Sequence, residues 1–553
     1  MSGQHSLVWK GLAESIPDRT ALRAADGRTW TFGQFAREAA GLAESLGQQG
    51  VRPGDRVAIL LHNRPEFLIT FYACLATGMI PVPLNYRLRG PEVAELLDDA
   101  QAAALVAPTS LAAVVEAALA ASTEQPGVIW VPDGAEAEPE AESAGGPEAE
   151  AESDSLAGQA WSDAIAPEGQ LPQAPPADAE MWIYTGGTTG RPRAARWVAS
   201  EMFEVQLFST YTLLGLTPPK DVSEAVSIAT DPGTPRVMTL PLAPFMHGTA
   251  LTVSLSTLVL GGTVLTTDSP RLDPEASVRM AVEFGATRIV VAGDAVSLPV
   301  LDAADRLGVR LDQVDSVFSS GMRFSPETKR RFHGHGRMTI VDLLATTEGG
   351  GFAVTQTTGA EDLPGRPRLM PTAVVLDENQ EEIQDEVGAM GILASHGALP
   401  RGYHGDERKT AETFPIIRGK RHVVPGDWVR VLEDRHIEFL GRGSSVVNTG
   451  GEKVYPQEVE EALMSHPSVQ DAVVVGIPDP RFGETVAAVV ATSDATTTGE
   501  LLDHVSSLLA GYKKPRHLMV RSALERSPQG KLNLKQLREE LIQDRREQEG
   551  VSR

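Results

Sequence analysis

A loop rich in glycine and threonine, Thr185–Gly190, constrains this sequence more than any other stretch. It follows the short apolar run Met181–Tyr184, which predicts a strand. Its three glycines let the backbone turn with positive φ and approach an anion closely, while N–H groups and hydroxyls supply donors. The pattern predicts a phosphate-binding loop, although the Gly-x-x-x-x-Gly-Lys-Ser/Thr spacing is absent. From these residues alone, the alternative is a mobile turn between core elements.

Apolar segments alternate with helical patterns along most of the chain. The first lobe predicts strands at 30–32, 56–61 and 80–84, and helices at 34–49, 64–76 and 91–100. This repeat is typical of parallel α/β sheets, whose ligands bind at the carboxyl ends of the strands. Between about 179 and 439, the apolar strands 237–242, 287–292 and 316–318 again lead into polar or glycine-rich segments. The predicted fold class is therefore α/β.

Two other stretches differ from this body. After Gly441-Arg442 a smaller, charged module begins, with a predicted helix at 457–465 and strands at 468–477 and 484–491. It predicts a separate α+β domain of roughly 100 residues. Residues 132–158 are rich in Ala, Glu, Gly, Pro and Ser, and predict a solvated, disordered acidic loop. An acidic docking segment is the alternative for that loop.

Composition excludes several classes of function. The 553 residues predict three or four structural units, and the formal net charge of -25 argues against a nucleic-acid partner. The single cysteine, Cys74, has apolar neighbours and is expected to be a buried thiol in a cytoplasmic protein. No signal peptide is expected at the N-terminus. The most apolar windows contain charges or polar residues, so no membrane span is expected.

The phosphate loop resembles the Thr-Ser-Gly-Thr-Thr-Gly-x-Pro-Lys signature of the adenylate-forming superfamily. Further signatures of that superfamily follow in its order, and the resemblance looks closest to the acyl-CoA ligases. It covers nearly the whole chain. The downstream matches are Thr347-Glu348, Gly426-Asp427, Gly441-Arg442, Gly450 to Pro456, and Pro528 to Lys531.

The resemblance implies two domains and two half-reactions. Residues 1–443 would bind the adenylate and acyl group, and residues 444–553 would form a mobile C-terminal domain. A carboxylate attacks ATP to give acyl-adenylate and pyrophosphate, and the CoA thiol then displaces AMP. The small domain is expected to rotate between these steps, with a hinge near Ser444 or Ser445.

The resemblance assigns a catalytic set and a nucleotide site. Glu348 matches the Mg²⁺ carboxylate, Thr347 a donor to the α-phosphate, and Lys531 the adenylation lysine. Asp427 matches the carboxylate that holds the ribose hydroxyls. The implied nucleotide-binding residues are Thr185, Gly186, Gly187, Thr188, Thr189, Gly190, Arg193, Gly321, Met322, Arg323, Leu344, Ala345, Asp427 and Arg442.

The same resemblance assigns the thiol and acyl sites. His247 matches a gate between the acyl pocket and the thiol tunnel, and a lone histidine before glycine would otherwise be unremarkable. The implied CoA-binding residues are Gly450, Gly451, Glu452 and Lys453, and the implied acyl-pocket residues are Gly248, Ala292, Gly293, Asp294 and Ser320. The pocket residues are mostly small, and Gly293-Asp294-Ala295 looks like ligases of steroid or terpenoid acids. A bulky polycyclic acid is therefore expected.

Three departures from the family pattern touch ATP. Arg193 replaces a lysine, Leu344-Ala345 replace an aromatic residue and a glycine, and Val424-Pro425 precede Gly426 in place of Arg-Thr. They suggest that adenylation is weakened or lost and that the enzyme mainly joins preformed acyl-AMP to CoA. In that case a separate adenylating enzyme would be a partner.

Alternatives stay open at this point. They are a complete ATP-dependent synthetase, a peptide-synthetase adenylation domain in which Asp294 pairs an amino group, and a non-catalytic acyl-adenylate-binding protein. Oligomeric state is open as well, a homodimer being one arrangement.

Overall fold

The computed structural model describes residues 4–133, 157–185, 192–442, 447–449, 452–479, 483–493, 496–509, 511–524, 526 and 532–551. The chain forms two compact units, residues 1–365 with 396–416 and residues 366–395 with 417–553. These limits differ from the boundary expected between residues 443 and 444, which stays a prediction. The expected acidic loop lies almost entirely outside the described residues.

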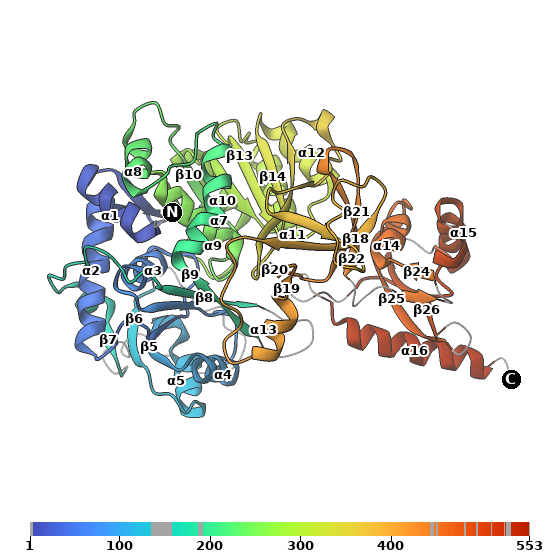
Figure 1. Ribbon diagram of the computed structural model, residues 1–553, viewed down its shortest axis with the longest axis horizontal. Coiled ribbons are helices and arrows are strands. Elements are labelled where there is room, and N and C mark those ends of the chain that lie inside the picture. Colours follow the sequence, from blue (N-terminus) through green and yellow to red (C-terminus); the bar gives the residue numbers. More distant parts are fainter. Residues whose placement is uncertain are drawn as a thin grey trace. The chain divides into compact units, whose positions relative to one another are not determined.

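The larger sheet of the first unit has the strand order β15-β14-β13-β12-β10-β11-β1-β2. Figure 1 labels β10, β13 and β14 of this sheet. The pairs β14–β15 and β1–β2 are antiparallel, and the pairs between them are parallel. The strands are β1 (Thr20–Ala24), β2 (Thr29–Thr31), β10 (Met238–Pro241), β11 (Thr263–Thr266), β12 (Arg288–Val291), β13 (Ser316–Ser320), β14 (Thr339–Thr346) and β15 (Gly350–Thr357).

A second sheet of the same unit is parallel throughout, in the order β4-β3-β5-β6-β7. The strands β8 and β9 pair as an antiparallel hairpin. The bounds are β3 (Arg56–Ile59), β4 (Ile80–Pro83), β5 (Ala102–Pro108), β6 (Gly127–Val131), β7 (Gln159–Ala160), β8 (Glu180–Thr185) and β9 (Arg193–Val198).

Local sequence signals explain where the helices of the first unit begin and end. Thr31 and Gln34 form a capping box at the start of α2, and Asp273 followed by Pro274 starts α10. Gly78 and Gly285 end α3 and α10 in the left-handed conformation that glycine adopts readily. The helices are α1 (His5–Ser15), α2 (Phe32–Gln48), α3 (Pro65–Thr77), α4 (Gly90–Ala100), α5 (Ala112–Ala121), α6 (Trp161–Ile165), α7 (Ala199–Thr212), α8 (Val222–Thr230), α9 (Gly248–Val259), α10 (Pro274–Phe284), α11 (Gly293–Leu307), α12 (Pro326–His335) and α13 (Glu407–Thr413).

The second unit contains two further sheets. One includes the path β20-β18-β21-β22, with β17 beside β18, and the other runs β24-β23-β26-β25, with β27 beside β26. Helices α14 and α16 both contact β25. The elements are β16 (Arg368–Leu369), β17 (Ala373–Leu376), β18 (Met390–His396), β19 (Ile416–Ile417), β20 (Lys420–Val423), β21 (Asp427–Val431), β22 (Ile437–Arg442), β23 (Val447–Thr449), β24 (Glu452–Val454), α14 (Pro456–Met464), β25 (Val469–Asp479), β26 (Gly483–Thr492), α15 (Thr498–Leu508), β27 (His517–Arg521) and α16 (Leu534–Val551).

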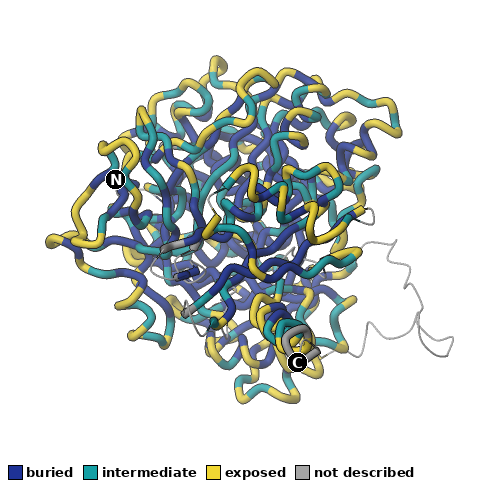
Figure 2. The backbone as a smooth tube through the Cα atoms, turned by 90° about the vertical axis from the view of Figure 1, so that its right-hand side faces the viewer, coloured by how far each residue is buried: buried dark blue, intermediate teal, exposed yellow. Residues whose placement is uncertain are grey.

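Burial follows the layers of the fold. The parallel strands β3 to β6 and β10 to β13 are buried at nearly every position, and exposed positions concentrate at the periphery of the molecule (Figure 2). Helix α9 lies against β10, β11 and β12, and α1 and α7 pack against α9. Within the described part of the chain, every helix is too short or too polar to serve as a bilayer span. The α/β class expected from the sequence is confirmed.

Candidate active site

Most of the expected site residues of the first unit lie at or just after the carboxyl ends of the four parallel strands β10, β12, β13 and β14. The register pairs Val291 with Ser319 and Ser320 with Leu343, so these strands end at one edge of the sheet. Gly293, Gly321 and Leu344 follow directly at that edge. Leu344 and Ala345 lie in the last part of β14, with a bulge between them, and both are half-buried. Ligands of open parallel sheets bind at such edges.

Gly293 sits in a tight contact at this edge. Its N–H donates to the Ser319 hydroxyl at 3.0 Å, and its φ is +53°. A Cβ at this position would lie 2.1 Å from the Arg323 carbonyl oxygen and 2.8 Å from the Met322 side chain. The expected acyl-pocket glycine and the expected nucleotide segment 321–323 are therefore in contact.

The Asp294 side chain has a local partner. Its Oδ1 accepts hydrogen bonds from the Ser325 N–H at 3.0 Å and the Ser325 hydroxyl at 3.1 Å. Ser325 in turn caps α12. This geometry gives Asp294 a structural role at a helix start. It does not favour a peptide-synthetase reading, in which this carboxylate would pair an amino group.

His247 lies on a segment that a buried asparagine fixes in place. Asn63 donates to the carbonyl oxygens of Pro241 and Ala243 at 2.9 and 2.8 Å, and accepts from the Phe245 N–H at 2.7 Å. The exposed His247 follows, and Gly248 then starts α9. Asn63 was not expected from the sequence, and it links the segment before α3 to the strand end that carries the histidine.

We expect Asn63→Leu to destabilise the first unit by about 3 kcal/mol, because it leaves two buried carbonyls and one N–H without partners. The thermal midpoint of the purified protein measures the effect. Asn85→Leu is the control, because within the described part of the chain the Asn85 side chain accepts only a local bond, from the Arg87 N–H. Equal shifts in both variants would contradict the role given to Asn63.

A second group of residues surrounds the turn between β14 and β15. Trp197 of β9 donates its indole N–H to the Thr347 carbonyl at 2.8 Å. The Tyr403 hydroxyl donates to Glu348 Oε1 at 2.8 Å. Burial and the Glu348 charge raise the pKa of Tyr403, so its hydroxyl stays protonated and remains a donor. The two expected catalytic residues of this turn, Thr347 and Glu348, are thus fixed from both sides.

Residues 401–404 form an additional strand-like segment beside β9. The Arg401 and His404 N–H groups donate to the Arg196 and Ala194 carbonyls, at 2.7 and 2.9 Å. Two residues beyond Tyr403, the Gly405 turn leads to Asp406, which caps α13. The segment therefore reaches both the Glu348 turn and the end of the phosphate-loop hairpin.

Asp406 binds Arg193, the first residue of β9. Arg193 Nε lies 2.8 Å from Asp406 Oδ2. Hydrogen bonds from the Lys409 N–H and from Arg193 lower the pKa of Asp406, so the pair is ionised at neutral pH. Where the family has a lysine, this chain has a guanidinium with one N–H committed to a carboxylate. Thr185, the last residue of β8, is paired with Arg193 across the hairpin.

A buried carboxylate anchors the same segment. Glu180 Oε1 lies 2.9 Å from Arg196 Nη2 and 2.7 Å from Arg401 Nη1, and Oε2 accepts from the Trp182 indole at 2.8 Å. Burial opposes ionisation, but these donors hold the pKa of Glu180 below its usual value. Sequence reasoning did not identify Glu180, Tyr403 or Asp406. The single sequence signal available for any of these three was the position of Glu180 at the start of an apolar run.

In the second unit, Asp427 and Arg442 are direct partners in the antiparallel pair β21–β22. Asp427 is 3% exposed. The backbone of Glu452 and Lys453 belongs to β24, where Lys453 pairs with Asn448. The expected ribose residues therefore lie together, and the expected CoA residues form a hairpin in the same unit. Their roles stay predictions.

Several expected site residues lie outside the described residues. They are Gly186, Gly187, Thr188, Thr189 and Gly190 of the phosphate loop, Gly450 and Gly451 of the CoA segment, and Lys531.

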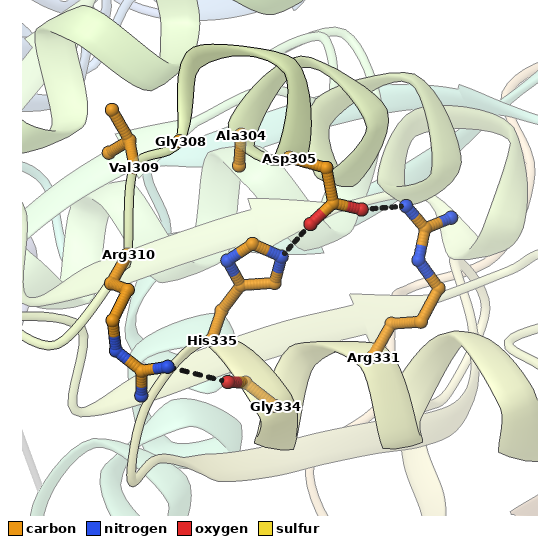
Figure 3. Close-up of a pocket in the computed structure, with 8 residues that line it drawn as sticks. All are labelled: Ala304, Asp305, Gly308, Val309, Arg310, Arg331, Gly334 and His335. Carbon is orange, nitrogen blue, oxygen red and sulfur yellow. Dashed lines mark hydrogen bonds and ion pairs between the residues drawn. The ribbon is translucent and has the colours of Figure 1, made fainter.

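A surface cavity of about 350 Å³ lies at the opposite edge of the larger sheet, at the C-terminal ends of α11 and α12 (Figure 3). Asp305 sits between Arg331 and His335, at 2.7 and 2.9 Å. Arg310 donates to the Gly334 carbonyl at 3.1 Å. The charged groups that line this cavity pair with one another, and the cavity is remote from the strand ends that carry the expected site. We do not assign catalysis to it.

An α/β fold with these residues at its strand ends fits an adenylate-forming type of enzyme, and comparison with known proteins identifies the family. The AMP-binding enzyme model matches residues 11–404, and the AMP-binding enzyme C-terminal domain matches residues 458–531. The chain belongs to the AMP-binding enzyme family and, within it, to the acyl-CoA ligases. The resemblance stated from the motifs is thereby confirmed.

Relatives and solved structures cover almost the whole chain. A medium/long-chain-fatty-acid–CoA/3-oxocholest-4-en-26-oate–CoA ligase of Mycolicibacterium smegmatis is 34% identical over 94% of this chain and 93% of its own length. A 3-oxocholest-4-en-26-oate–CoA ligase of Rhodococcus rhodochrous is 34% identical over 93% and 92%. The fold is similar to ATP-bound MatB from Rhodopseudomonas palustris, with a TM-score of 0.76, 22% identity and coverage of 97% and 99%.

Proposed function

We propose that this protein forms CoA thioesters of bulky hydrophobic carboxylic acids through an acyl-adenylate, with ATP and CoA as co-substrates. The observation that carries the proposal is the fixed Glu348, which accepts from the buried Tyr403 hydroxyl at 2.8 Å beside Thr347. A carboxylate held in one place can orient charge-neutralising groups where pyrophosphate leaves, and such preorganised stabilisation dominates phosphoryl chemistry.

The residues at this turn suit Mg²⁺. Glu348 and the Thr347 hydroxyl are hard oxygen donors, which Mg²⁺ prefers. The described residues contain no group of three or more His, Cys, Asp or Glu side chains able to hold a metal. This agrees with a cation bound by one carboxylate together with substrate phosphates. When bound, Mg²⁺ would neutralise charge on the departing pyrophosphate, and Glu348 is the residue that would hold it.

The acid is proposed to be polycyclic and steroid-like. Support comes from the small residues Gly248, Ala292 and Gly293 at the strand ends, and from the names of the relatives, which act on medium- and long-chain fatty acids and on 3-oxocholest-4-en-26-oate. A pocket lined by small side chains leaves more room for the rings of the acid than one lined by bulky side chains.

A second candidate is an enzyme specialised for the thioester step. It is favoured by the Arg193–Asp406 pair, which commits part of the charge at the phosphate loop, and by Leu344-Ala345, which offer adenine no aromatic face. Such an enzyme would convert acyl-AMP made elsewhere.

A paired assay separates the two candidates. Pyrophosphate release is measured from sterol and linear acids with ATP and Mg²⁺, and acyl-CoA formation from the matching synthetic adenylates with CoA. We expect both activities with sterol acids. Acyl-CoA from the adenylates without pyrophosphate release would establish the specialised enzyme, and activity in neither assay would overturn both candidates.

The double variant Arg193→Lys with Leu344→Tyr tests what limits adenylation. It is expected to raise pyrophosphate release, because it restores a compact charge and an aromatic face, while the thioester step changes little. An unchanged rate would mean that these positions do not limit the first half-reaction.

A further inference from the structure

A cluster of buried polar side chains lies between α1, α7 and α9 of the first unit. The His5 ring and the Gln206 side-chain oxygen are 2.9 Å apart, and the Ser256 hydroxyl donates to the same oxygen at 3.0 Å. The three residues are 0%, 6% and 7% exposed. The His5 ring stands edge-on to Phe203, 5.0 Å away. Burying a polar group in such aromatic surroundings costs free energy unless the group forms hydrogen bonds.

The cluster has hydrogen-bonding capacity left over. Since the Gln206 oxygen already accepts two bonds, the amide Nε2 remains as a donor, and His5 Nδ1 remains as an acceptor. Neither atom has a partner among the described residues, and the same holds for Trp9 Nε1 and the Tyr72 hydroxyl. The rings of Trp9 and Tyr72 lie 5.1 Å apart, and Trp9 lies 5.7 Å from His5. Buried polar groups are normally satisfied, so several orphans in one place call for an explanation.

The cluster is suited to a neutral partner. Burial lowers the pKa of His5 to about 4, which the hydrogen bond with Gln206 only partly offsets. At neutral pH the imidazole is therefore uncharged. An amide N–H and an imidazole nitrogen match a keto or hydroxyl oxygen better than an ionised group.

Helix α9 connects the cluster to the expected acyl pocket. It begins at Gly248, and Thr252 and Ser256 follow at intervals of four residues, on roughly the same side of the helix. The distance from Gly248 to Ser256 along the axis is about 12 Å. The side chains on this path are small, and Thr252 is only half-buried.

Helix α7 places the cluster beside the catalytic turn as well. Val205, the residue before Gln206, packs against Gly350, since a Cβ on that glycine would lie 2.8 Å from the valine side chain. Gly350 is two residues beyond Glu348. The part of α7 that carries Gln206 therefore lies beside the turn that carries Glu348.

We propose that His5, Gln206 and Ser256 form the polar end of the acyl-binding region and select acids that carry a keto or hydroxyl oxygen at the end remote from the carboxylate. Gln206 Nε2 donates to that oxygen, and His5 Nδ1 accepts from it when it is a hydroxyl. The inference rests on the proposed function and names a feature of the acid that the proposed function leaves open.

The test uses two sterol acids that differ only in the 3-oxo group on the ring remote from the carboxylate. The ratio of kcat/KM for acyl-CoA formation from the two acids is measured for the full chain and for Gln206→Leu. We expect the unaltered protein to prefer the oxo acid about tenfold, the usual worth of one hydrogen bond to a substrate. The variant should lose this preference through a higher KM for the oxo acid, with the deoxy acid unaffected.

Matched variants keep the result interpretable. Glu204→Gln, an exposed change on the same helix, should retain the preference. His5→Phe removes the hydrogen bond that orients the Gln206 side chain and should reduce the preference for the oxo acid less than Gln206→Leu does, while turnover of the deoxy acid reports that both variants fold.

Equal ratios in the unaltered protein and in both cluster variants would overturn this inference alone. Turnover of linear acids but of neither sterol acid would overturn the proposed substrate class and the inference together.

Discussion

Glu348→Gln is expected to lower pyrophosphate release from acid and ATP by about 10²–10³-fold, the usual effect of removing one group that stabilises transition-state charge. Glutamine keeps the size and one oxygen of the side chain but removes the charge that Mg²⁺ would bind. Acyl-CoA formation from a synthetic adenylate should change only a few-fold, because no pyrophosphate leaves in that step. The two rates are measured side by side on the same preparation.

Tyr403→Phe tests the hydrogen bond that holds the Glu348 carboxylate. It removes the hydroxyl that donates to the carboxylate at 2.8 Å and keeps the ring that packs on Phe414. We expect a loss of about tenfold in pyrophosphate release, in line with one charge-assisted hydrogen bond, and a higher Mg²⁺ concentration for half-maximal rate. Titrating Mg²⁺ into the protein in the presence of nucleotide measures the affinity for the ion independently of turnover. If Glu348→Gln reduced both half-reactions equally, its assignment to the pyrophosphate side would be wrong.

Gly293→Ala is expected to destabilise the protein by about 2–5 kcal/mol. Its φ of +53° costs an alanine about 1–2 kcal/mol. The added Cβ would lie 2.1 Å from the Arg323 carbonyl oxygen, so the backbone must shift, at a further cost of about 1–3 kcal/mol. Soluble yield and the thermal midpoint measure the outcome.

Gly308→Ala separates the two causes. Gly308 has a similar φ of +63°, but an added Cβ would meet no atom within 4 Å. We expect it to cost about 1 kcal/mol, the conformational part alone. Equal losses at the two glycines would mean that the contact of Gly293 with the 321–323 segment does not constrain the site.

Much of the fold could be predicted because its signals are local. The alternation of apolar strands and helical stretches located β3, α3, β4 and α4 to within a few residues, and the apolar run before the glycine loop located β8. Family membership also followed from motifs of a few adjacent residues. Such signals depend on near neighbours in the chain, so no tertiary knowledge is required to recognise them.

The support around the candidate site could not be predicted in the same way. Glu348 and its partner Tyr403 are 55 residues apart, and Asn63 is 182 residues from Phe245. Neither partner stands in a motif that announces its contact, because pairing across such distances is decided by the packing of whole elements. Asp294 illustrates the converse. Its place directly after a buried strand was foreseeable, but the Ser325 bonds that occupy its carboxylate depend on where α12 begins.

The segment that holds Glu348 and Arg193 has a consequence for how this enzyme could vary. Tyr403 and Asp406 stand three residues apart on one continuous stretch, and each reaches a different part of the site. An inserted or deleted residue between them would move one contact by about 3.3 Å relative to the other, and both could not be kept. The number of residues between Tyr403 and Asp406 is therefore constrained more tightly than their identity. A related enzyme that keeps both contacts can replace His404 or Gly405 but cannot insert or delete a residue there.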